Sequence, residues 1–341
     1  QYGTPLGITR ETLQHALAAH PQAKALFCVA PTYHGIVTNL KEQVALATAC
    51  GIPTIVDAAH GSHFHSGYGP EPAVASGASF VVESWHKTMG SLTQTAVLLQ
   101  QDTTWPVERY LRLLQSSSPS YLLMASLDVT RAMWQQNRDV FAEKLCRLST
   151  MARQGLAQIP ILQCLGTADW PEPVWAWDAS RLVLVSKREH SGGQIATALR
   201  RYGIEPEMAD ASTVVLFLTI ADEEATIQHL LHACQQAAID LAAETPAAWP
   251  LIGDFPIPPQ KLLPADALAQ AVHAVPLSGC SGGIAGAAIT PYPPGIPLVG
   301  LGEEISQQTI SQLKQILKEG GMVQGLASVC PPALWLIDAE K

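Results

Sequence analysis

The sequence predicts an α/β protein in which a larger domain with a mostly parallel sheet is followed by a smaller α/β domain. Up to about residue 100, short continuous apolar runs alternate with segments whose apolar residues recur at helical spacing. Continuous apolar runs are typical of strands buried on both faces, and their alternation with helices favours a parallel sheet covered on both sides. A second alternation of strand and helix begins at residue 181. We therefore expect a first domain over residues 1–165 and a second, with a proline-rich tail, over residues 166–341.

The elements of the first domain follow from apolar spacing and from the residues that end each run. Leu13, Ala16 and Leu17 recur at helical spacing. Pro31 ends the first apolar run, and Gly51 ends the second helix. The predicted helices are 10–19, 40–50 and 73–78, and the predicted strands are 25–30, 53–57, 79–84 and 95–99. A mostly helical stretch over 107–158, interrupted at 116–119, completes this domain.

The second domain has fewer elements. Its predicted strands are 181–185 and 214–220, and its predicted helices are 194–202, 225–243 and 307–318. Residues 169–177, rich in proline and tryptophan, are predicted to form a linker in which Trp170, Trp175 and Trp177 only pack. Residues 249–259 and a rigid turn at 292–297 make up the proline-rich tail.

The composition excludes several classes of function. Hydrophobic residues make up 48% of the 341 residues and charged residues 14%, and the formal net charge is −9. Nucleic-acid binding needs a cationic surface, and no basic run is present. No apolar run approaches the roughly 18 residues that a membrane helix requires. Seven scattered cysteines without a C-x-x-C pair predict a reduced, cytoplasmic protein. The low charge also indicates that another subunit covers part of the surface.

Polar residues follow three predicted strands, at the edge where parallel sheets bind ligands. Asp57 ends one buried strand, and Lys87 leaves the next one thirty positions later (87 − 57). This pair suits a Schiff-base cofactor, because the lysine forms the imine while the aspartate keeps a pyridine nitrogen protonated. The alternative is a structural ion pair between Asp57 and Lys87 at the end of the sheet.

Four motifs in one order resemble the ornithine/lysine/arginine decarboxylases, which are pyridoxal-phosphate enzymes of the aspartate-aminotransferase fold (fold type I). Residues 56–64 read V-D-A-A-H-G-S-H-F and residues 84–94 read S-W-H-K-T-M-G-S-L-T-Q, and both resemble cofactor motifs of that family. Residues 114–128 resemble its serine-rich S-P-S-Y segment, and residues 289–297 resemble its C-terminal Y-P-P-G-I-P turn. The resemblance covers nearly the whole chain.

The resemblance implies decarboxylation of a basic amino acid (arginine, lysine or ornithine) to the corresponding amine, a lyase reaction of amino-acid metabolism and polyamine biosynthesis. It also implies pyridoxal 5′-phosphate as the cofactor and a homodimer or larger homo-oligomer. Lys87 would be the Schiff-base lysine and Asp57 the partner of the pyridinium nitrogen. The further residues implied to contact the cofactor are Ala59 beneath the ring, His60 near it, Ser84 and His86 on the phosphate, and Ser117 or Ser118 on the phosphate of the other subunit.

The chain departs from the family pattern in two motifs and in its start. Ala58 stands where the family has glutamate, and Leu301-Gly302-Glu303 stands where it has P-G-E. The family's T-N-G-S/T phosphate loop and its ring-stacking histidine precede the part that matches here, and the chain opens with Gln1 instead of methionine. We therefore expect the chain to be a fragment of a longer enzyme.

Other interpretations stay open at this point. His60, His63 and His65 lie close together on a loop, but no cysteine or carboxylate adjoins them, so no metal site is expected. Residues 32–35 resemble a family turn that approaches the cofactor, and they equally suit a turn that ends a strand. An aminotransferase or an aldolase-type lyase would use the same aspartate and lysine. A catalytically silent paralogue would account for the missing glutamate at position 58. The sequence leaves the choice among the three basic amino acids undetermined.

Overall fold

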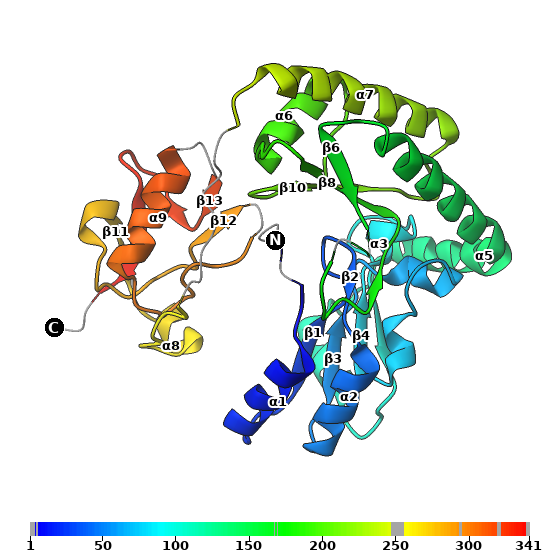
Figure 1. Ribbon diagram of the computed structural model, residues 1–341. Helices are drawn as coiled ribbons and strands as arrows, with labels where there is room; N and C mark the ends of the chain where they lie inside the picture. The colour runs from blue at the N-terminus through cyan, green and yellow to red at the C-terminus, as the bar shows by residue number, and fades with distance from the viewer. Residues whose placement is uncertain are drawn as a thin grey trace.

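The computed structural model describes residues 4, 6–166, 168, 170–246, 256–292, 295–318 and 322–338. Its three largest sheets follow one another along the chain, as the colours of Figure 1 show. Each has its own buried apolar core. The first sheet carries the residues singled out above.

The first sheet has the strand order β1-β3-β4-β5 within the described residues. Its strands are β1 (Leu26–Val29), β3 (Thr54–Asp57), β4 (Phe80–Glu83) and β5 (Val97–Gln100). The first three run parallel, which confirms the mostly parallel sheet. β5 is antiparallel to β4, because the segment 84–96 contains only the short helix α3 (Trp85–Thr88) and turns back instead of crossing the sheet.

Helices α1 (Arg10–Ala19) and α2 (Leu40–Ala49) cover one face of this sheet, as their shared core shows. Each helix begins at a side-chain cap, Thr9 for α1 and Asn39 for α2. The predicted short helix at 73–78 is the 3-10 helix η2 (Ala73–Ser76), and a second one, η1 (Ser62–Ser66), follows β3.

The opposite face of the first sheet is only partly covered. Phe27 and Val29 on β1 are 60% and 54% exposed, while Leu26 and Cys28, which alternate with them, are buried. Side chains alternate across a strand, so the exposed pair belongs to one face. The prediction that both faces are covered is therefore wrong at β1, whereas it agrees with β4, where the neighbouring Phe80 and Val81 are both buried.

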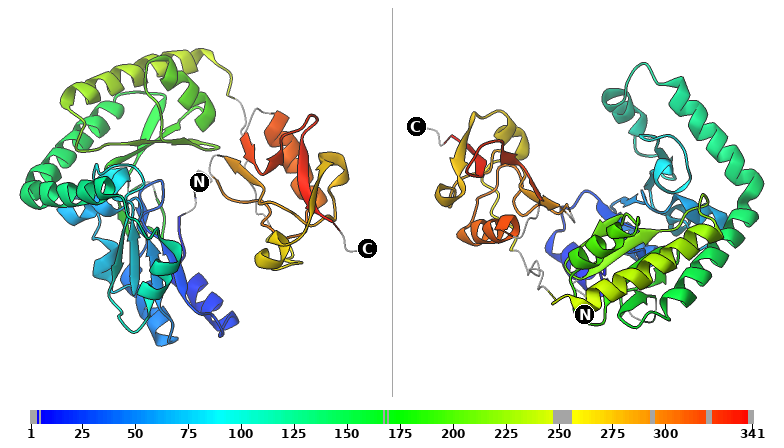
Figure 2. Two further views of the ribbon diagram at one scale, coloured as in Figure 1. Left: turned by 180° about the vertical axis from the view of Figure 1, so that it is seen from behind. Right: turned by 90° about the horizontal axis from the view of Figure 1, so that it is seen from above.

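The long helical stretch after β5 is confirmed. It consists of α4 (Val107–Leu114) and α5 (Tyr121–Leu156), separated near the predicted break, and Ser120 caps α5. The backbone of Asn137 is non-helical, and its side chain donates to the Met133 carbonyl, so α5 bends there. Figure 2 shows this bent helix passing from the first sheet to the second.

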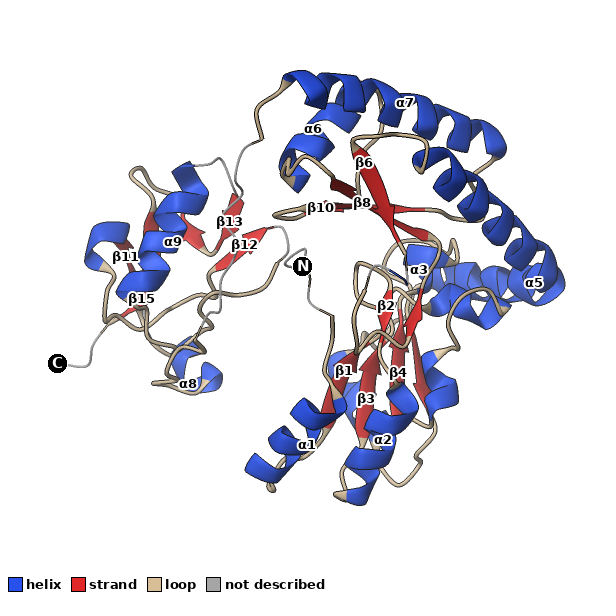
Figure 3. Cartoon of the chain, viewed as in Figure 1, coloured by secondary structure: helices blue, strands red, loops and turns tan. Residues whose placement is uncertain are grey.

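The second sheet is antiparallel, with the order β6-β8-β10-β9. Its strands are β6 (Leu162–Leu165), β8 (Arg181–Ser186), β9 (Met208–Ala209) and β10 (Thr213–Phe217). The predicted helices are confirmed as α6 (Gly192–Arg201) and α7 (Glu224–Ala243), which lie together over one face of this sheet (Figure 3). The predicted domain boundary at 165/166 falls directly after β6, which is a strand of this sheet.

The predicted linker at 169–177 is partly a strand. β7 (Ala176–Trp177) pairs with β2 (Ile36–Val37), a strand that the sequence analysis did not predict. Trp177 stacks on Trp170 with ring centroids 5.4 Å apart, and both are buried, whereas Trp175 is exposed. These strands are only two residues long, which is too short for an apolar pattern to reveal.

The third sheet belongs to residues 256–338. It is built from β11 (Val272–Pro276), β14 (Leu326–Ala327) and β15 (Ala333–Ile337). A separate antiparallel pair consists of β12 (Thr290–Tyr292) and β13 (Met322–Gln324). α8 (Pro264–Leu268), η4 (Leu277–Gly279) and the predicted helix α9 (Gln307–Lys318) complete this part of the chain. Pro293 and Pro294 of the predicted turn, and most of the segment 249–259, lie outside the described residues. Within the described residues no helix is long and apolar enough to span a bilayer.

Candidate active site

The two predicted catalytic residues follow neighbouring parallel strands. β3 ends at Asp57, which is opposite Val82 of β4 in the sheet register. β4 ends at Glu83, and Lys87 lies in α3, which begins two residues later. Parallel strands end at the same edge of a sheet, so Asp57 and Lys87 project from one edge.

Lys87 and Asp57 do not pair with each other. Lys87 is exposed, and its Nζ lies 3.2 Å from Nε2 of His60. The half-buried carboxylate of Asp57 accepts a hydrogen bond from the backbone N–H of Ala59 at 2.9 Å. No ion pair within 4.0 Å joins these two described residues, so the alternative of a structural ion pair finds no support.

The residues around Lys87 leave polar atoms unused. Ser84 precedes α3 but its hydroxyl does not cap the helix. The Oγ1 of Thr88 is buried and has no hydrogen-bond partner within the described part of the chain. Nδ1 of His86 lies 2.7 Å from the carbonyl oxygen of Thr95, which only accepts, so Nδ1 carries the proton.

Ser117 and Ser118 lie elsewhere in this chain. They occupy the turn between α4 and α5, where both are exposed. Ser118 exchanges its recorded hydrogen bonds with Ser116. Their predicted role concerns a second subunit, so this single chain leaves it a prediction.

A buried ion network beneath His60 went unnoticed in the sequence analysis. Nη2 of Arg181 donates to the backbone oxygen of His60 at 3.1 Å, and Nε lies 3.3 Å from the Asp178 carboxylate. Nε2 of His63 lies 3.1 Å from the Asp178 carboxylate, and the Ser180 hydroxyl donates to that carboxylate at 2.6 Å. Asp178 and Arg181 are 0% and 1% exposed. The signal in the sequence is two charged residues three positions apart at the start of an apolar run.

The environment of these buried groups decides their charge. Burial would raise the pKa of Asp178, but His63 and Arg181 outweigh it and hold the pKa below its usual range. Burial, and then the positive charge of Arg181, lowers the pKa of His60 from 6.5 to about 3. His60 is therefore a neutral imidazole at physiological pH.

The turn at 32–35 reaches this network. The ring of Tyr33 lies on His60 with centroids 4.4 Å apart. Nε2 of His34 is 3.0 Å from both Asp210 and the hydroxyl of Thr213. The turn thus both ends β1 and contacts a residue of the candidate site.

The three clustered histidines have different partners. His60 contacts Lys87, His63 contacts Asp178, and Nε2 of His65 lies 2.9 Å from Glu83. In the ranges that the structure describes, no group of three His, Cys, Asp or Glu residues is arranged to hold a metal ion.

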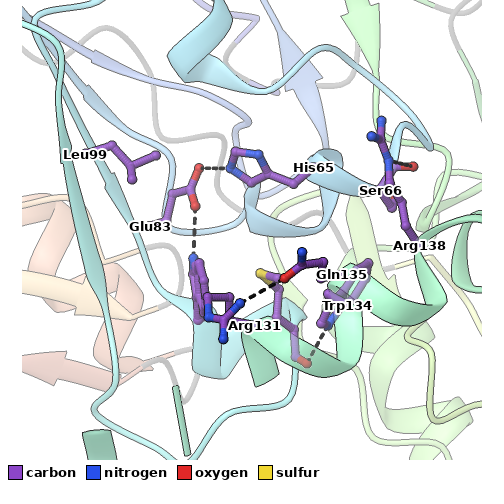
Figure 4. Close-up of a pocket in the computed structure, with 10 residues that line it drawn as sticks. His65, Ser66, Glu83, Leu99, Arg131, Trp134, Gln135 and Arg138 are labelled. Carbon is purple, nitrogen blue, oxygen red and sulfur yellow. Dashed lines mark hydrogen bonds and ion pairs between the residues drawn. The ribbon is translucent and has the colours of Figure 1, made fainter. Parts of the chain in front are cut away.

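A cavity of about 260 Å³ lies beside the end of β4 (Figure 4). Glu83 points toward it and is 1% exposed, and its two oxygens accept from His65 at 2.9 Å and from Trp85 Nε1 at 3.0 Å. Glu83 therefore ties η1 to α3. The remaining wall residues are Ser66, Met89, Leu99, Arg131, Trp134, Gln135 and Arg138.

Known proteins with similar sequences match both ends of the chain. A sequence profile described as "Orn/Lys/Arg decarboxylase, major domain" matches residues 1–168, and one for the C-terminal domain of the same family matches residues 256–324. The arginine decarboxylase of Bacillus subtilis is 32% identical over 95% of this chain and 68% of its own length. That of Bacillus anthracis is 31% identical over 99% of this chain and 70% of its own length.

Solved structures show the same fold. The constitutive lysine decarboxylase of E. coli superposes with a TM-score of 0.73 and 16% identity over 97% of this chain. The lysine decarboxylase of Francisella novicida superposes with a TM-score of 0.75 and is 17% identical over 97% of this chain. This chain spans 61% and 60% of the lengths of those two proteins. A serine palmitoyltransferase of S. paucimobilis was solved with a PLP–myriocin aldimine. It superposes with a TM-score of 0.55 and is 18% identical over 69% of this chain and 60% of its own length.

These structural likenesses confirm the predicted fold type I. The profile matches and the identity to relatives of which the chain covers more than two thirds confirm the predicted family. The chain belongs to the ornithine/lysine/arginine decarboxylase family.

Proposed function

We propose that this chain carries the reactive lysine and the ring-binding aspartate of a pyridoxal-phosphate-dependent decarboxylase of basic amino acids. The observation that carries the proposal is the position of Asp57 and Lys87 at one sheet edge without an ion pair between them. A lysine and an aspartate that neutralised each other would leave no charge for a cofactor. Here the carboxylate meets a backbone N–H and the amine meets an imidazole.

The donors present fit pyridoxal phosphate. Lys87 offers an exposed primary amine, and Asp57 offers an anionic acceptor for a protonated ring nitrogen. The unused hydroxyls of Ser84 and Thr88 suit phosphate oxygens. The Nδ1–H of His86 donates to the Thr95 carbonyl. Nε2 of His86 is therefore the ring nitrogen left for phosphate, and it can donate when the ring is an imidazolium.

Pyridoxal phosphate, when bound, supplies an electron-accepting ring that stabilises the carbanion left by departing carbon dioxide. The chain's residues prepare and protect that chemistry. Lys87 provides the amine that attaches the cofactor, and Asp57 holds a proton on the ring nitrogen. Ala59 would pack beneath the ring, while His60 stays neutral beside Lys87 and adds no competing positive charge.

Arginine is the first substrate to assay. The named relatives at 31–32% identity are arginine decarboxylases, whereas the structures of lysine decarboxylases are 16–18% identical. Lysine and ornithine follow, since the same profile covers all three amino acids.

The residue at position 58 argues against a silent paralogue. Ala58 is 1% exposed and packs in the core of the first sheet. The side chain at this position therefore lies on the buried side of the strand end, and alanine there leaves Asp57 and Lys87 in place. A glutamate at position 58 is thus not needed for the proposed site.

We also propose a homodimer in the cytoplasm. The free cysteines support a reducing compartment. A patch of large exposed apolar side chains on α4, on α5 and next to their turn supports a subunit interface. We call it the α4–α5 patch, and it consists of Tyr110, Leu113, Leu114, Tyr121, Leu122 and Met124.

The decisive experiment measures carbon dioxide released from arginine, lysine and ornithine by the full-length gene product, incubated with pyridoxal phosphate. Amino-group transfer to a keto acid is followed in parallel, and Lys87→Ala is the control. We expect release from one basic amino acid, none from the variant, and no transfer. Transfer without carbon dioxide would instead identify an aminotransferase. An absorbance scan with no imine band would identify a silent protein.

A further inference from the structure

His60 lies between the reactive lysine and the buried Asp178–Arg181 pair. Its Nε2 is 3.2 Å from Lys87 Nζ, and its Nδ1 is 3.5 Å from Nη2 of Arg181. Tyr33 and Phe217 contact the imidazole, with ring centroids 4.4 and 5.7 Å away. The ring is therefore held with one nitrogen toward each cationic side chain.

The arginine decides which ring nitrogen carries the proton. A guanidinium group has only donors, so the Nδ1 that faces it has to offer a lone pair. A neutral imidazole has one N–H, which is then at Nε2 and points toward Lys87. An Nε2–H needs an acceptor, and Lys87 has a lone pair only as the unprotonated amine.

The arginine itself is fixed in place. Its Nε lies 3.3 Å from Oδ2 of Asp178, and its Cζ lies 3.3 Å from the ring centroid of Phe217. The same guanidinium donates to the backbone oxygen of His60 at 3.1 Å. Two contacts to one residue prevent His60 from moving away from the arginine.

We propose that Asp178 and Arg181 are positioning residues that hold His60 as its Nε2–H tautomer, so that the hydrogen bond from His60 increases the share of Lys87 present as the free amine. The proposal rests on the proposed function only in taking Lys87 as the reactive lysine. Its content concerns the protonation of Lys87 before any cofactor binds. A free amine is the form of lysine that attacks carbonyl carbon.

The charged and titratable groups around His60 and Lys87 come from several elements. Arg181 begins β8, Asp178 follows β7, His63 lies in η1, Asp57 ends β3, and Tyr33 follows β1. The lowered pKa of His60, about 3, is caused first by burial and next by Arg181, which agrees with a neutral imidazole.

The test measures how fast Lys87 reacts in the chain without cofactor. Reductive methylation with formaldehyde, followed by peptide mass spectrometry, reports the free-amine fraction of each lysine across pH. In the double variant Asp178→Asn/Arg181→Met, we expect the Lys87 rate near neutral pH to fall about fivefold, which corresponds to losing one hydrogen bond. Lys24, exposed in the loop before β1, is the internal control and does not change.

A second variant, His60→Gln, distinguishes an effect of Arg181 on the His60 tautomer from an effect of the Arg181 charge on Lys87. His60→Gln places an amide donor near the position of Nε2, with no tautomer to choose. We expect Lys87 in His60→Gln to react nearly as fast as in the parent, and the Asp178→Asn/Arg181→Met change to have no further effect there. An equal fall in both backgrounds would mean that Arg181 acts only through its charge, and it would overturn the proposal.

The tautomer of His60 can also be measured directly in the parent chain, without any substitution at Asp178 or Arg181. Two-bond ¹H–¹⁵N correlations of the parent, assigned by the loss of one signal set in His60→Gln, distinguish Nε2–H from Nδ1–H. We expect Nε2–H. A proton on Nδ1, or unchanged Lys87 labelling in the folded double variant, would reject the proposal. These readouts need neither cofactor nor amino acid, so they are independent of the decarboxylase assay.

Discussion

At the scale of single residues, Lys87 carries the chemistry while contributing little to the fold. Its side chain is exposed, and its recorded contact is with His60. In Lys87→Ala we expect decarboxylation to fall at least about 1,000-fold, as for other nucleophile deletions. The free energy of unfolding should change by no more than about 0.5 kcal/mol, as is usual for surface positions. Trapping with borohydride checks this, because an adduct that persisted in the variant would place the imine on another lysine.

Asp57 is expected to act on rate more than on binding. Asp57→Asn keeps an oxygen for the Ala59 N–H but removes the charge that holds the ring nitrogen protonated. We expect turnover to fall about 100-fold, a loss typical of removing one electrostatic contact to the reacting group. Cofactor retention should stay near that of the parent. Equal losses in a cofactor titration and a rate assay would instead show that Asp57 is structural.

His60 links the stability of the site to pH. The pKa of His60 is about 3 in the folded chain and 6.5 in the unfolded chain, so between these values the unfolded chain binds more protons. Stability is therefore full above about pH 6.5 and is lost as pH falls, with a slope approaching about 1.4 kcal/mol per pH unit. Urea unfolding from pH 7 to pH 4 measures this. His60→Gln should flatten the slope by nearly one proton, and an unchanged slope would contradict the shift.

At the scale of elements, a turn in the first sheet depends on space for the buried arginine. Gly35 has φ +86°, and a Cβ there would lie 2.7 Å from Cγ of Arg181. Gly51 has φ +71° with nothing within 4 Å, so it is the matched control. Gly51→Ala should cost about 1 kcal/mol from the left-handed backbone alone. Gly35→Ala should cost at least about 2 kcal/mol because the clash is added. Similar melting temperatures for the two variants would show that Arg181 moves aside freely.

The strands and helices with long apolar patterns could be predicted from the sequence. α9 (Gln307–Lys318) agrees to the residue, and β3 and β4 agree within two, because their apolar runs end at polar or turn residues. The direction of β5 could not be predicted, since an apolar run is the same in either orientation. Two-residue strands such as β2 are held by partners that are distant in sequence.

The candidate site could be predicted only where its residues lie in motifs. Asp57, His60 and Lys87 are adjacent to strand ends within one short part of the chain, so their proximity follows from the parallel sheet. Arg181 reaches His60 from the second sheet, more than a hundred residues later, and Asp178 holds Arg181. No local pattern connects this pair to His60. The sequence signal for this pair is two opposite charges, Asp178 and Arg181, three positions apart where an apolar run begins.

At the scale of the whole molecule, two exposed apolar surfaces make different predictions about association. The first is the α4–α5 patch, where Leu114 is 85% exposed. The second is the uncovered face of the first sheet, where Phe27 is 60% exposed on β1. Only 14% of the residues are charged, so little electrostatic repulsion opposes contact through either surface.

We expect the α4–α5 patch to make a defined dimer and the sheet face to cause nonspecific association. Leu114→Glu places a charge in the middle of the patch and should convert the dimer to a monomer, as measured by light scattering after size exclusion. Phe27→Lys should reduce precipitation without changing the dimer mass, because a lysine on an open strand face discourages further pairing. Leu268→Glu, at a 76% exposed position of α8, is the control and should change neither property. A dimer that survives Leu114→Glu and dissociates with Phe27→Lys would place the interface on the sheet. Ser117 and Ser118 would then not contact a second active site through the α4–α5 patch.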